Sequence, residues 1–231
     1  MATFTTTQNQ TQSVVASLFR SVYLQMAAAL TITGLTAFFV SHSETLLMMF
    51  YANPMMIWLI LGAEIGIVIW LSSRLMRMSV GMATILFIAY SVLTGVSLAS
   101  IFLVYQLGTI ASAFFATAGT FLVMSLLGYT TKMDLSKMGN ILIMMLIGLI
   151  IGTVINIFWA NSTLYWIITY AGIIIFTGLV AWDTQNLRRL FEQHGAADDM
   201  GQKLAIYGAL SLYLDFINLF LYLLRFLGNR D

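Results

Sequence analysis

Seven long apolar stretches constrain the fold of this 231-residue chain more than any other feature. Each is about 17 to 25 residues long, the length at which an α-helix crosses roughly 30 Å of hydrocarbon. They cover residues Val22–Val40, Met55–Leu71, Gly81–Tyr105, Ile110–Tyr129, Gly139–Trp159, Leu164–Trp182 and Leu204–Leu227. The pattern predicts an all-α integral membrane protein with seven transmembrane helices.

The composition agrees with a polytopic membrane protein. The chain is 60% hydrophobic and 8% charged, whereas soluble domains carry about 25% charged residues. A net charge of +1 is too small to indicate a nucleic-acid partner. Because there are no cysteines, disulfides, thiol chemistry and thiolate metal sites are excluded. His42 and His194 both fall in predicted loops, so we expect no zinc site.

The polar start of the chain differs from a signal peptide. It is rich in Thr and Gln and has no charged side chain before Arg20, whereas a signal peptide begins with a basic segment. We interpret residues 1–20 as a polar N-terminal tail, disordered or interfacial, followed by a retained first span. No linker divides residues 21–231, so we expect one transmembrane domain. Its only long polar loop is predicted at Thr184–Lys203.

The basic residues predict the orientation in the membrane. With a cytoplasmic N-terminus, eight of them are cytoplasmic: Arg20, Arg74, Arg77, Lys132, Lys137, Arg188, Arg189 and Lys203. Only Arg225 and Arg230 lie on the other side, which satisfies the positive-inside rule. Seven full spans then place the C-terminus outside. A re-entrant seventh segment, which would return both arginines to the cytoplasm, is the alternative.

Small residues recur at four-residue spacing in two of the stretches. Gly62 and Gly66 form one GxxxG pattern, and Gly148 and Gly152 form another. Such faces allow helices to approach closely. We expect them to serve packing inside a monomeric bundle rather than dimerisation.

Asp215, in the middle of the last stretch, is the most informative polar residue. An intramembrane carboxylate is costly unless it is paired, hydrated or protonated, so it indicates function. On a helical wheel it shares a face about 100° wide with polar neighbours. These are Gly208, Ser211, Asn218, Tyr222 and Arg225. The stripe is expected to face protein or water, which makes the seventh helix a central one.

Three residues are candidate partners for Asp215: Asp183, Glu64 and Arg74. Two carboxyl groups close together in a low-dielectric site share a proton. Once both are deprotonated they form a hard oxygen site suited to Ca²⁺. Protons and Ca²⁺ would then compete. Glu64 in the same cavity would add a third oxygen ligand or a second proton acceptor.

Each of these candidates also has a structural interpretation. Asp183 can be a helix-end residue near Arg188 and Arg189. Glu64 can be a protonated packing residue in the bilayer. Arg74 and Arg77 can be topology anchors. Contact between Asp183 and Asp215 requires the sixth helix to extend past Trp182, or the seventh to begin after Leu204.

Three segments resemble the Bax inhibitor-1 family, also called the transmembrane Bax inhibitor motif family, and its bacterial inner-membrane branch. They are GLVAWDTQNL, ALSLYLDFINLFLYLLRFLG and the loop GYTTKMDLSKMGN. The family's sixth-helix pattern is an aromatic residue followed by DTQ, here Trp182 to Gln185, although Tyr is the more usual aromatic. The seventh-helix pattern LYLDFINLF is intact. The resemblance extends from Arg20 to Gly228.

The resemblance implies a fold in which six helices surround the seventh. It implies that Asp183 and Asp215 form a pH-sensing pair that controls a slow Ca²⁺ leak. Arg74 or Arg77 would be the latch to this pair, although neither aligns without a shift. Glu64 corresponds to an acidic residue of the second helix in some members. Family members suppress cell death in eukaryotes, and some bacterial relatives restrain a membrane-bound quality-control protease.

Together these observations predict a pH-sensitive Ca²⁺ leak channel or Ca²⁺/H⁺ transporter in the bacterial inner membrane. Asp183 and Asp215 would hold the ion, and Ca²⁺ is the transported ion rather than a cofactor. Glu64, Ser211 and Asn218 would line the path. We expect no enzymatic activity, and the partners to be the lipid bilayer, Ca²⁺ and H⁺.

Two alternatives remain. An intramembrane aspartyl protease also uses two aspartates, but the GxGD context before Asp215 and a PAL segment are absent, since Pro54 is the only proline. A non-catalytic regulator of a membrane protease would use the N-terminal tail or the loop from Arg188 to Lys203.

Overall fold

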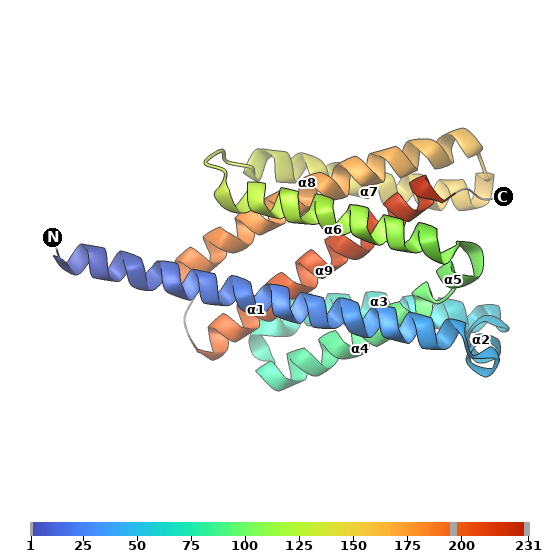
Figure 1. Ribbon diagram of the computed structural model, residues 1–231, viewed down its shortest axis with the longest axis horizontal. Coiled ribbons are helices and arrows are strands. Elements are labelled where there is room, and N and C mark those ends of the chain that lie inside the picture. The colour runs from blue at the N-terminus through green and yellow to red at the C-terminus, as the bar shows by residue number, and fades with distance from the viewer. Residues whose placement is uncertain (1, 195–197, 229–231) are drawn as a thin grey trace. The chain divides into compact units, whose positions relative to one another are not determined.

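Helices make up almost the whole chain in the computed structural model, which describes residues 2–194 and 198–228. Side chains are described from Gln12 onward, apart from that of Pro54. Within these ranges there is no strand (Figure 1). The elements are α1 (Ala2–Ser41), α2 (Glu44–Tyr51), α3 (Pro54–Arg74), the 3₁₀ turn η1 (Leu75–Arg77), α4 (Val80–Leu98), α5 (Ile101–Val104), α6 (Leu107–Thr130), α7 (Ser136–Trp159), α8 (Ser162–His194) and α9 (Asp199–Leu227).

The seven predicted spans are confirmed in number and order. Among the described residues, seven helical segments are long and apolar enough to cross a membrane: Gln12–Ser41, Met55–Arg77, Val80–Val104, Leu107–Thr130, Ser136–Trp159, Ser162–His194 and Asp199–Leu227. The last of them is an unbroken helix of 29 residues, about 43 Å long at 1.5 Å per residue. A re-entrant segment would need a break in this helix, so a full crossing is the arrangement that fits.

Short polar residues set the helix starts in the first half of the chain. The hydroxyl of Ser43 accepts a hydrogen bond from the Leu46 N–H at the start of α2. Asn53 does the same for Met55 at 2.9 Å, and Pro54 occupies the first turn of α3, where a missing N–H costs nothing. Ser79 caps α4 through the N–H of Met82. These caps satisfy N–H groups that a helix start leaves without partners.

The polar N-terminal segment is helical, so it is not the disordered tail that was one of its two expected forms. Helix α1 already begins at Ala2. Val15, Leu18 and Phe19 are buried, and the ring of Phe19 meets that of Phe191 edge-on at 5.2 Å. The spacing of these apolar residues is that of one helix face. The sequence prediction rested on the average polarity of the segment, which does not show that its few apolar residues share one helix face.

The polar loop predicted at Thr184–Lys203 is shorter than expected. Helix α8 continues to His194 and α9 begins at Asp199. His194 is therefore the last residue of a helix rather than part of a loop, whereas His42 does lie in the turn after α1. Helix α8 continues beyond the apolar stretch because Leu187 and Phe191 keep one of its faces buried.

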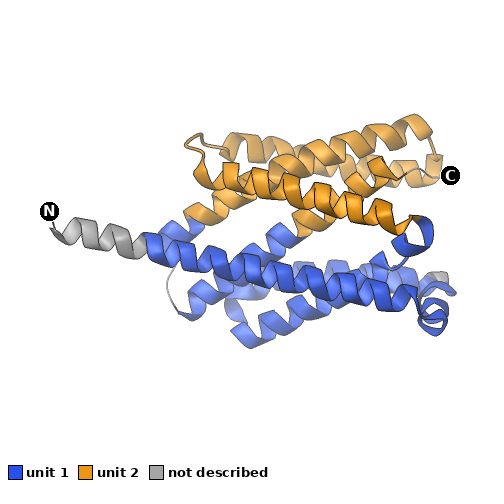
Figure 2. Ribbon diagram, viewed as in Figure 1, with its two compact units in different colours: residues 1–104, 190–213 blue, residues 105–189, 214–231 orange. Residues whose placement is uncertain are grey.

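The chain divides into two compact units, shown in Figure 2. Unit 1 comprises residues 1–104 and 190–213, and unit 2 comprises residues 105–189 and 214–231. Helices α8 and α9 each contribute to both units. The core of unit 2 contains Leu142, Leu149, Ile168, Ile175, Phe176, Leu179 and Leu219. A core cluster of unit 1 contains Val40, Ile60, Val96 and Ala99. The boundary predicted between residues 20 and 21, and the single domain after it, stay predictions.

Helix α9 is the most buried of the seven spans, as expected for a central helix. In its most apolar window 67% of the residues are buried, against 11% for the spans of α3 and α7. None of the polar stripe residues is exposed, and apolar side chains on the opposite side of the helix, such as Leu210 and Phe220, are buried as well. A helix buried on all sides contacts protein rather than lipid.

The GxxxG patterns are not where the helices approach closely. A methyl group added at Gly62, Gly66 or Gly148 would meet no atom within 4 Å, and only Gly152 has a neighbour, the side chain of Ile168. The prediction of internal packing is therefore wrong for three of the four glycines. Four-residue spacing identifies a small face but does not say which side of the helix contacts protein. The close approaches in unit 2 include those at Gly128, Gly139 and Gly172.

Candidate functional site

Asp183 and Asp215 lie together in unit 2, on α8 and α9 respectively. Helix α8 extends well beyond Trp182, which was one of the two conditions for this contact. The Asp215 side chain is within hydrogen-bonding reach of Asp183. Asp215 is 5% exposed, and Asp183 is half-buried. The structure thus places together the two carboxyl groups that the sequence singled out.

One oxygen of the pair has no partner. Asp215 Oδ2 is buried and forms no hydrogen bond with any side chain or backbone group that the structure describes. A buried polar atom without a partner requires an explanation, such as a proton, a water molecule or an ion. Two carboxylates at this separation also repel each other strongly in a low-dielectric interior. The pair is therefore suited to holding one proton or one cation.

The residues next to Asp183 are fixed by three different neighbours. Successive residues of a helix point about 100° apart, so Trp182, Thr184 and Gln185 face different elements. A methyl group at Gly139 of α7 would collide with the Trp182 indole, and one at Gly128 of α6 would collide with the Ala181 backbone. This segment of α8 is therefore held closely by α6 and α7, which fixes the position of Asp183.

Thr184 binds α6 through a buried hydroxyl pair. Its hydroxyl donates to the Val180 carbonyl at 2.7 Å and lies 3.1 Å from the Ser125 hydroxyl. Because the single proton of Thr184 is used on Val180, Ser125 is the donor in the second bond. Both side chains are buried. The hydroxyl pair fixes the rotation of α8 relative to α6, one residue away from Asp183.

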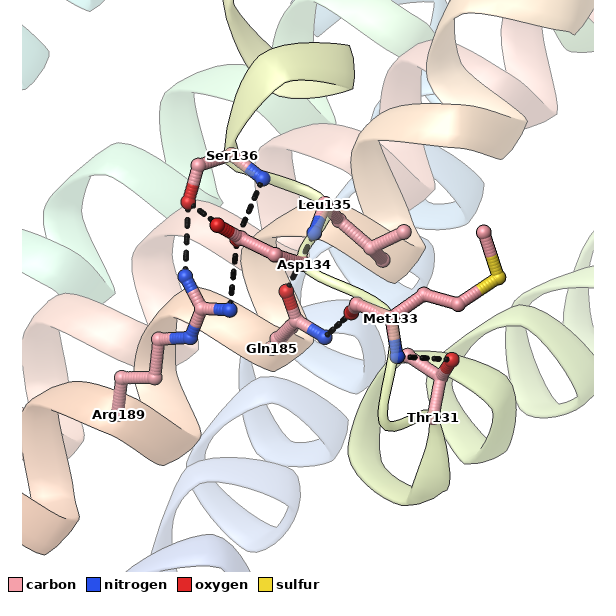
Figure 3. Close-up of polar contacts among 7 residues, drawn as sticks. All are labelled: Thr131, Met133, Asp134, Leu135, Ser136, Gln185 and Arg189. Carbon is pink, nitrogen blue, oxygen red and sulfur yellow. Dashed lines mark hydrogen bonds and ion pairs between the residues drawn. The ribbon is translucent and has the colours of Figure 1, made fainter.

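Gln185 holds the α6–α7 loop by its backbone (Figure 3). Its Nε2 donates to the Met133 carbonyl at 2.7 Å, and its Oε1 accepts from the Leu135 N–H at 2.8 Å. The amide thus uses a donor and an acceptor on the same short stretch of chain. The loop folds back on itself through a bond from the Met133 N–H to the Thr131 hydroxyl at 3.2 Å. Gln185 is buried, so these bonds are shielded from solvent.

Arg189 forms an ion pair with the same loop (Figure 3). Its guanidinium donates to Asp134 Oδ1 and to the Ser136 hydroxyl, both at 2.7 Å. Asp134 Oδ1 also accepts from the hydroxyl and the N–H of Ser136 at the start of α7. The hydrogen bonds from Ser136 and then from Arg189 lower the pKa of Asp134 to about 2. This carboxyl is exposed and stays ionised at physiological pH.

Arg188 binds the end of α6. Its guanidinium donates to the Tyr129 carbonyl and lies 5.2 Å from the centre of the Tyr129 ring. Together with Gln185 and Arg189 it attaches the end of α6 and the following loop to α8. Most of the residues in these contacts were missed by sequence reasoning. Gln185 carried a signal, since it ends the aromatic-DTQ pattern, but its partners are backbone atoms.

Glu64, Arg74 and Arg77 belong to unit 1. Glu64, half-buried in α3, accepts a hydrogen bond from the Ser97 hydroxyl at 2.6 Å. Arg74 ends α3 and Arg77 lies in η1, and both side chains are exposed. An exposed position near a helix end fits a topology anchor. The latch role stays a prediction.

Three further polar residues of the spans, Asn218 and Arg225 of α9 and Asn156 of α7, have partners in the structure. Asn218 donates to the Leu214 carbonyl of its own helix at 2.8 Å, and Asn156 accepts from the N–H of Asn161 in the following turn. Neither of these hydrogen bonds joins two of the spans. Ser211 is half-buried. Arg225 stacks on Tyr165, with 4.9 Å from its guanidinium to the ring centre.

Comparisons with known proteins agree over nearly the full length of the chain. A family model described as "Inhibitor of apoptosis-promoting Bax1" matches residues 15–231. The chain is 43% identical to the Inner membrane protein YbhL of Escherichia coli (strain K12) over 222 residues, 96% of this chain and 95% of that protein. It is 41% identical to the uncharacterized protein RP147 of Rickettsia prowazekii over 227 residues, 98% of this chain and 95% of that protein.

Proposed function

The chain belongs to the Bax inhibitor-1 family of membrane proteins, and from this premise we propose that it is a pH-sensitive Ca²⁺ leak channel or Ca²⁺/H⁺ transporter. The observation that carries the proposal is the pairing of Asp183 with the buried Asp215. An intramembrane carboxylate survives only if it is paired, hydrated or protonated, and such groups mark ion and proton paths.

The pair works as a switch because its two carboxyl groups cannot both be ionised without compensation. At low pH they share a proton, and the shared hydrogen bond holds α8 and α9 together. At higher pH the proton is lost, and the two negative charges either repel each other or bind a divalent cation. Release of the proton and entry of Ca²⁺ are therefore linked at one place. Loss of the proton weakens the contact between the two helices, and a bound cation offsets the repulsion.

The ligand set suits passage of Ca²⁺ better than tight storage. Ca²⁺ prefers six to eight oxygen ligands, and its affinity rises with the number of charged ones. Among the described residues, no group of three or more His, Asp or Glu side chains could hold a metal ion. Two carboxylates, completed by water, give weak binding. An ion must leave a site as readily as it enters if it is to be conducted.

The two aspartates of the pair differ in how firmly their surroundings hold them. Asp183 lies beside residues that bind α6 and the α6–α7 loop, namely Thr184 and Gln185. Asp215, on α9, has a free oxygen. In this proposal α8 is the fixed element and the contact to α9 is the one that changes with protonation.

Ca²⁺ flux into proteoliposomes, measured with an entrapped dye between pH 5 and 8, tests the proposal. We expect flux to rise with pH as the pair loses its proton, and Asp215→Asn to abolish this dependence. Asp183→Asn should act in the same way. Glu44→Gln, which alters an exposed carboxyl of α2, is the matched control. The proposal would be overturned if the Ca²⁺ flux of the native protein did not change between pH 5 and 8. It would also be overturned if Asp215→Asn kept the pH dependence.

We propose the bacterial inner membrane as the location, with a cytoplasmic N-terminus and the C-terminus outside. Support comes from the name of the Escherichia coli relative, an inner membrane protein, and from the eight basic residues that seven spans place on one side.

A further inference from the structure

The third span of unit 1 is broken before it reaches its end. Helix α4 stops at Leu98 and α5 starts at Ile101, although the span runs from Val80 to Val104. A break at membrane depth is tolerated only where protein or a water-lined cavity satisfies the backbone. Here the Tyr51 hydroxyl of α2 donates to the carbonyls of Val96 and Ser97. In transporters, unwound carbonyls of broken helices coordinate cations.

Glu64 faces this break. Its Oε1 lies 2.6 Å from the Ser97 hydroxyl, a separation typical of a hydroxyl that donates to an ionised carboxylate. Within the described part of the chain this is the only hydrogen bond of the Glu64 side chain, which forms no ion pair there. A single hydrogen bond does not compensate a half-buried negative charge in a membrane span. A proton or a metal cation is therefore needed at this position.

Among the described residues, no side chain forms an ion pair with Glu64. Glu64 acts electrostatically on three tyrosines: Tyr51 of α2, Tyr90 of α4 and Tyr213 of α9. Arg74 follows ten residues later on the helix of Glu64, about 15 Å along its axis, and is exposed. The Lys203 ammonium is bound to the Met76 carbonyl. The C-terminal end of α4 adds further negative potential through its carbonyl groups.

A second observation also indicates a ligand. Tyr90, Thr94 and Ser97 follow one another at helical spacing along α4. The Thr94 hydroxyl is 5% exposed and forms no hydrogen bond in good geometry, although it lies beside the hydroxyls of Tyr90 and Tyr213. Buried hydroxyls without a protein partner are commonly satisfied by water.

Tyr213 can accept a bond from such a water. The Thr33 hydroxyl donates to the Ser91 carbonyl at 2.9 Å, so in its 2.7 Å bond with Tyr213 it must accept. The Tyr213 proton is therefore used, and its oxygen, which lies beside the Thr94 hydroxyl, can only accept further bonds. Oxygen atoms of one carboxylate and several hydroxyls, with water between them, are the ligands of hard cations.

We propose that Glu64, Ser97 and Thr94 form a site for one monovalent metal cation of the Na⁺ type, for which a proton competes. The Glu64 carboxylate and the Ser97 hydroxyl contact the ion, and Thr94 holds its water. A single carboxylate neutralises one positive charge, whereas Ca²⁺ would leave an excess charge in the membrane. The site lies in unit 1 and does not involve Asp183 or Asp215. It would therefore stand even if the aspartate pair proved not to be a Ca²⁺ switch.

Thermal unfolding of the full-length protein in lipid nanodiscs tests this site. NaCl is compared with choline chloride at equal ionic strength, at pH 8 and pH 5. At a Na⁺ concentration about five times the dissociation constant, binding to the folded state should raise Tm by about 2–4 °C over choline at pH 8. The difference should shrink at pH 5, where the proton competes. Glu64→Gln should abolish it, and Asp215→Asn should retain it.

Further variants keep the test decisive if Glu64→Gln fails to fold. Ser97→Ala and Thr94→Val should each raise the Na⁺ concentration that gives half of the Tm shift, while the exposed Glu44→Gln should leave it unchanged. Equal Tm values in Na⁺ and choline for the native protein at both pH values would overturn the proposal. A Tm difference between Na⁺ and choline that stays as large in Glu64→Gln as in the native protein would also overturn it. The same holds if the Na⁺ concentration that gives half of the Tm shift is unchanged in both Ser97→Ala and Thr94→Val.

Discussion

At the scale of single residues, Asp134 and Asp215 show how surroundings decide what a carboxyl group does. Asp134 accepts hydrogen bonds from Ser136 and Arg189 and is exposed. Asp215 is buried, with one oxygen unpartnered. The sequence singled out Asp215 because a charge in an apolar stretch is costly. It gave no such signal for Asp134, whose ion pair joins residues 55 positions apart.

Asp134 is not expected to contribute to pH sensing between pH 5 and 8. Its pKa is lowered to about 2 by Ser136 and Arg189, from about 3.9 in an unfolded chain. A lowered pKa contributes stability above the unfolded value, and this is lost only as pH falls from about 4 through about 2. Asp134→Asn should thus leave the shape of the Ca²⁺ flux profile unchanged. Loss of the pH dependence in this variant would contradict the assignment of sensing to Asp183 and Asp215.

Gln185 is expected to stabilise the α6–α7 loop. Gln185→Ala leaves the Met133 carbonyl and the Leu135 N–H without their partner. Loss of a partner for such backbone groups costs about 1–3 kcal/mol. The neighbouring Asn186 is exposed, so Asn186→Ala is the matched control and should change stability by less than about 0.5 kcal/mol. Reversible unfolding in mixed micelles measures both, and equal losses would contradict the role of Gln185.

At the scale of helices, the apolar stretches predicted the positions of the helices better than their lengths. The sixth stretch ends at Trp182 in the sequence, yet α8 continues to His194. Hydropathy reports where a helix leaves the lipid, whereas hydrogen bonds and buried residues such as Leu187 and Phe191 decide where it ends. The contact between Asp183 and Asp215 was conditional on this extension. Hydropathy alone does not determine whether the sixth helix extends past Trp182.

The close approach of α6 to α8 at Gly128 is expected to be essential for packing. A methyl group there would lie 2.2 Å from the Ala181 carbonyl oxygen, a backbone atom that cannot rotate away. Gly128→Ala should therefore separate the two helices, which costs about 1–3 kcal/mol as overpacking. Gly119 lies on the same helix with no atom within 4 Å, so Gly119→Ala is the control.

Thermal unfolding of both variants distinguishes the two glycines. Gly119→Ala should be neutral or stabilising, since alanine favours helix more than glycine does. Gly128→Ala should lower Tm and, because Asp183 follows Ala181 by two residues, also alter the pH dependence of flux. An unchanged Tm in Gly128→Ala would mean that α8 is not held as closely as the structure indicates.

At the scale of the whole molecule, the sequence predicted the class of fold and the number of spans but not which faces meet. Gly62 and Gly66 looked like a packing face, but a methyl group added at either would meet no atom within 4 Å, whereas Gly128 and Gly139 carried no such pattern and touch α8. In a membrane, lipid-facing and protein-facing sides are both apolar, so composition cannot separate them. The orientation, in contrast, depends on charge, which the sequence shows directly.

The orientation can be tested with cysteines, because the native chain has none. Met133, in the α6–α7 loop, is 74% exposed, and Ser162, at the start of α8, is also exposed. One span, α7, separates them. Met133→Cys should react with an impermeant maleimide only from the cytoplasmic side, because the basic residues lie there. Ser162→Cys should react only from the other side. Labelling of both from one side would mean that α7 does not cross the membrane, and exchanged sides would reverse the orientation while leaving the seven spans intact.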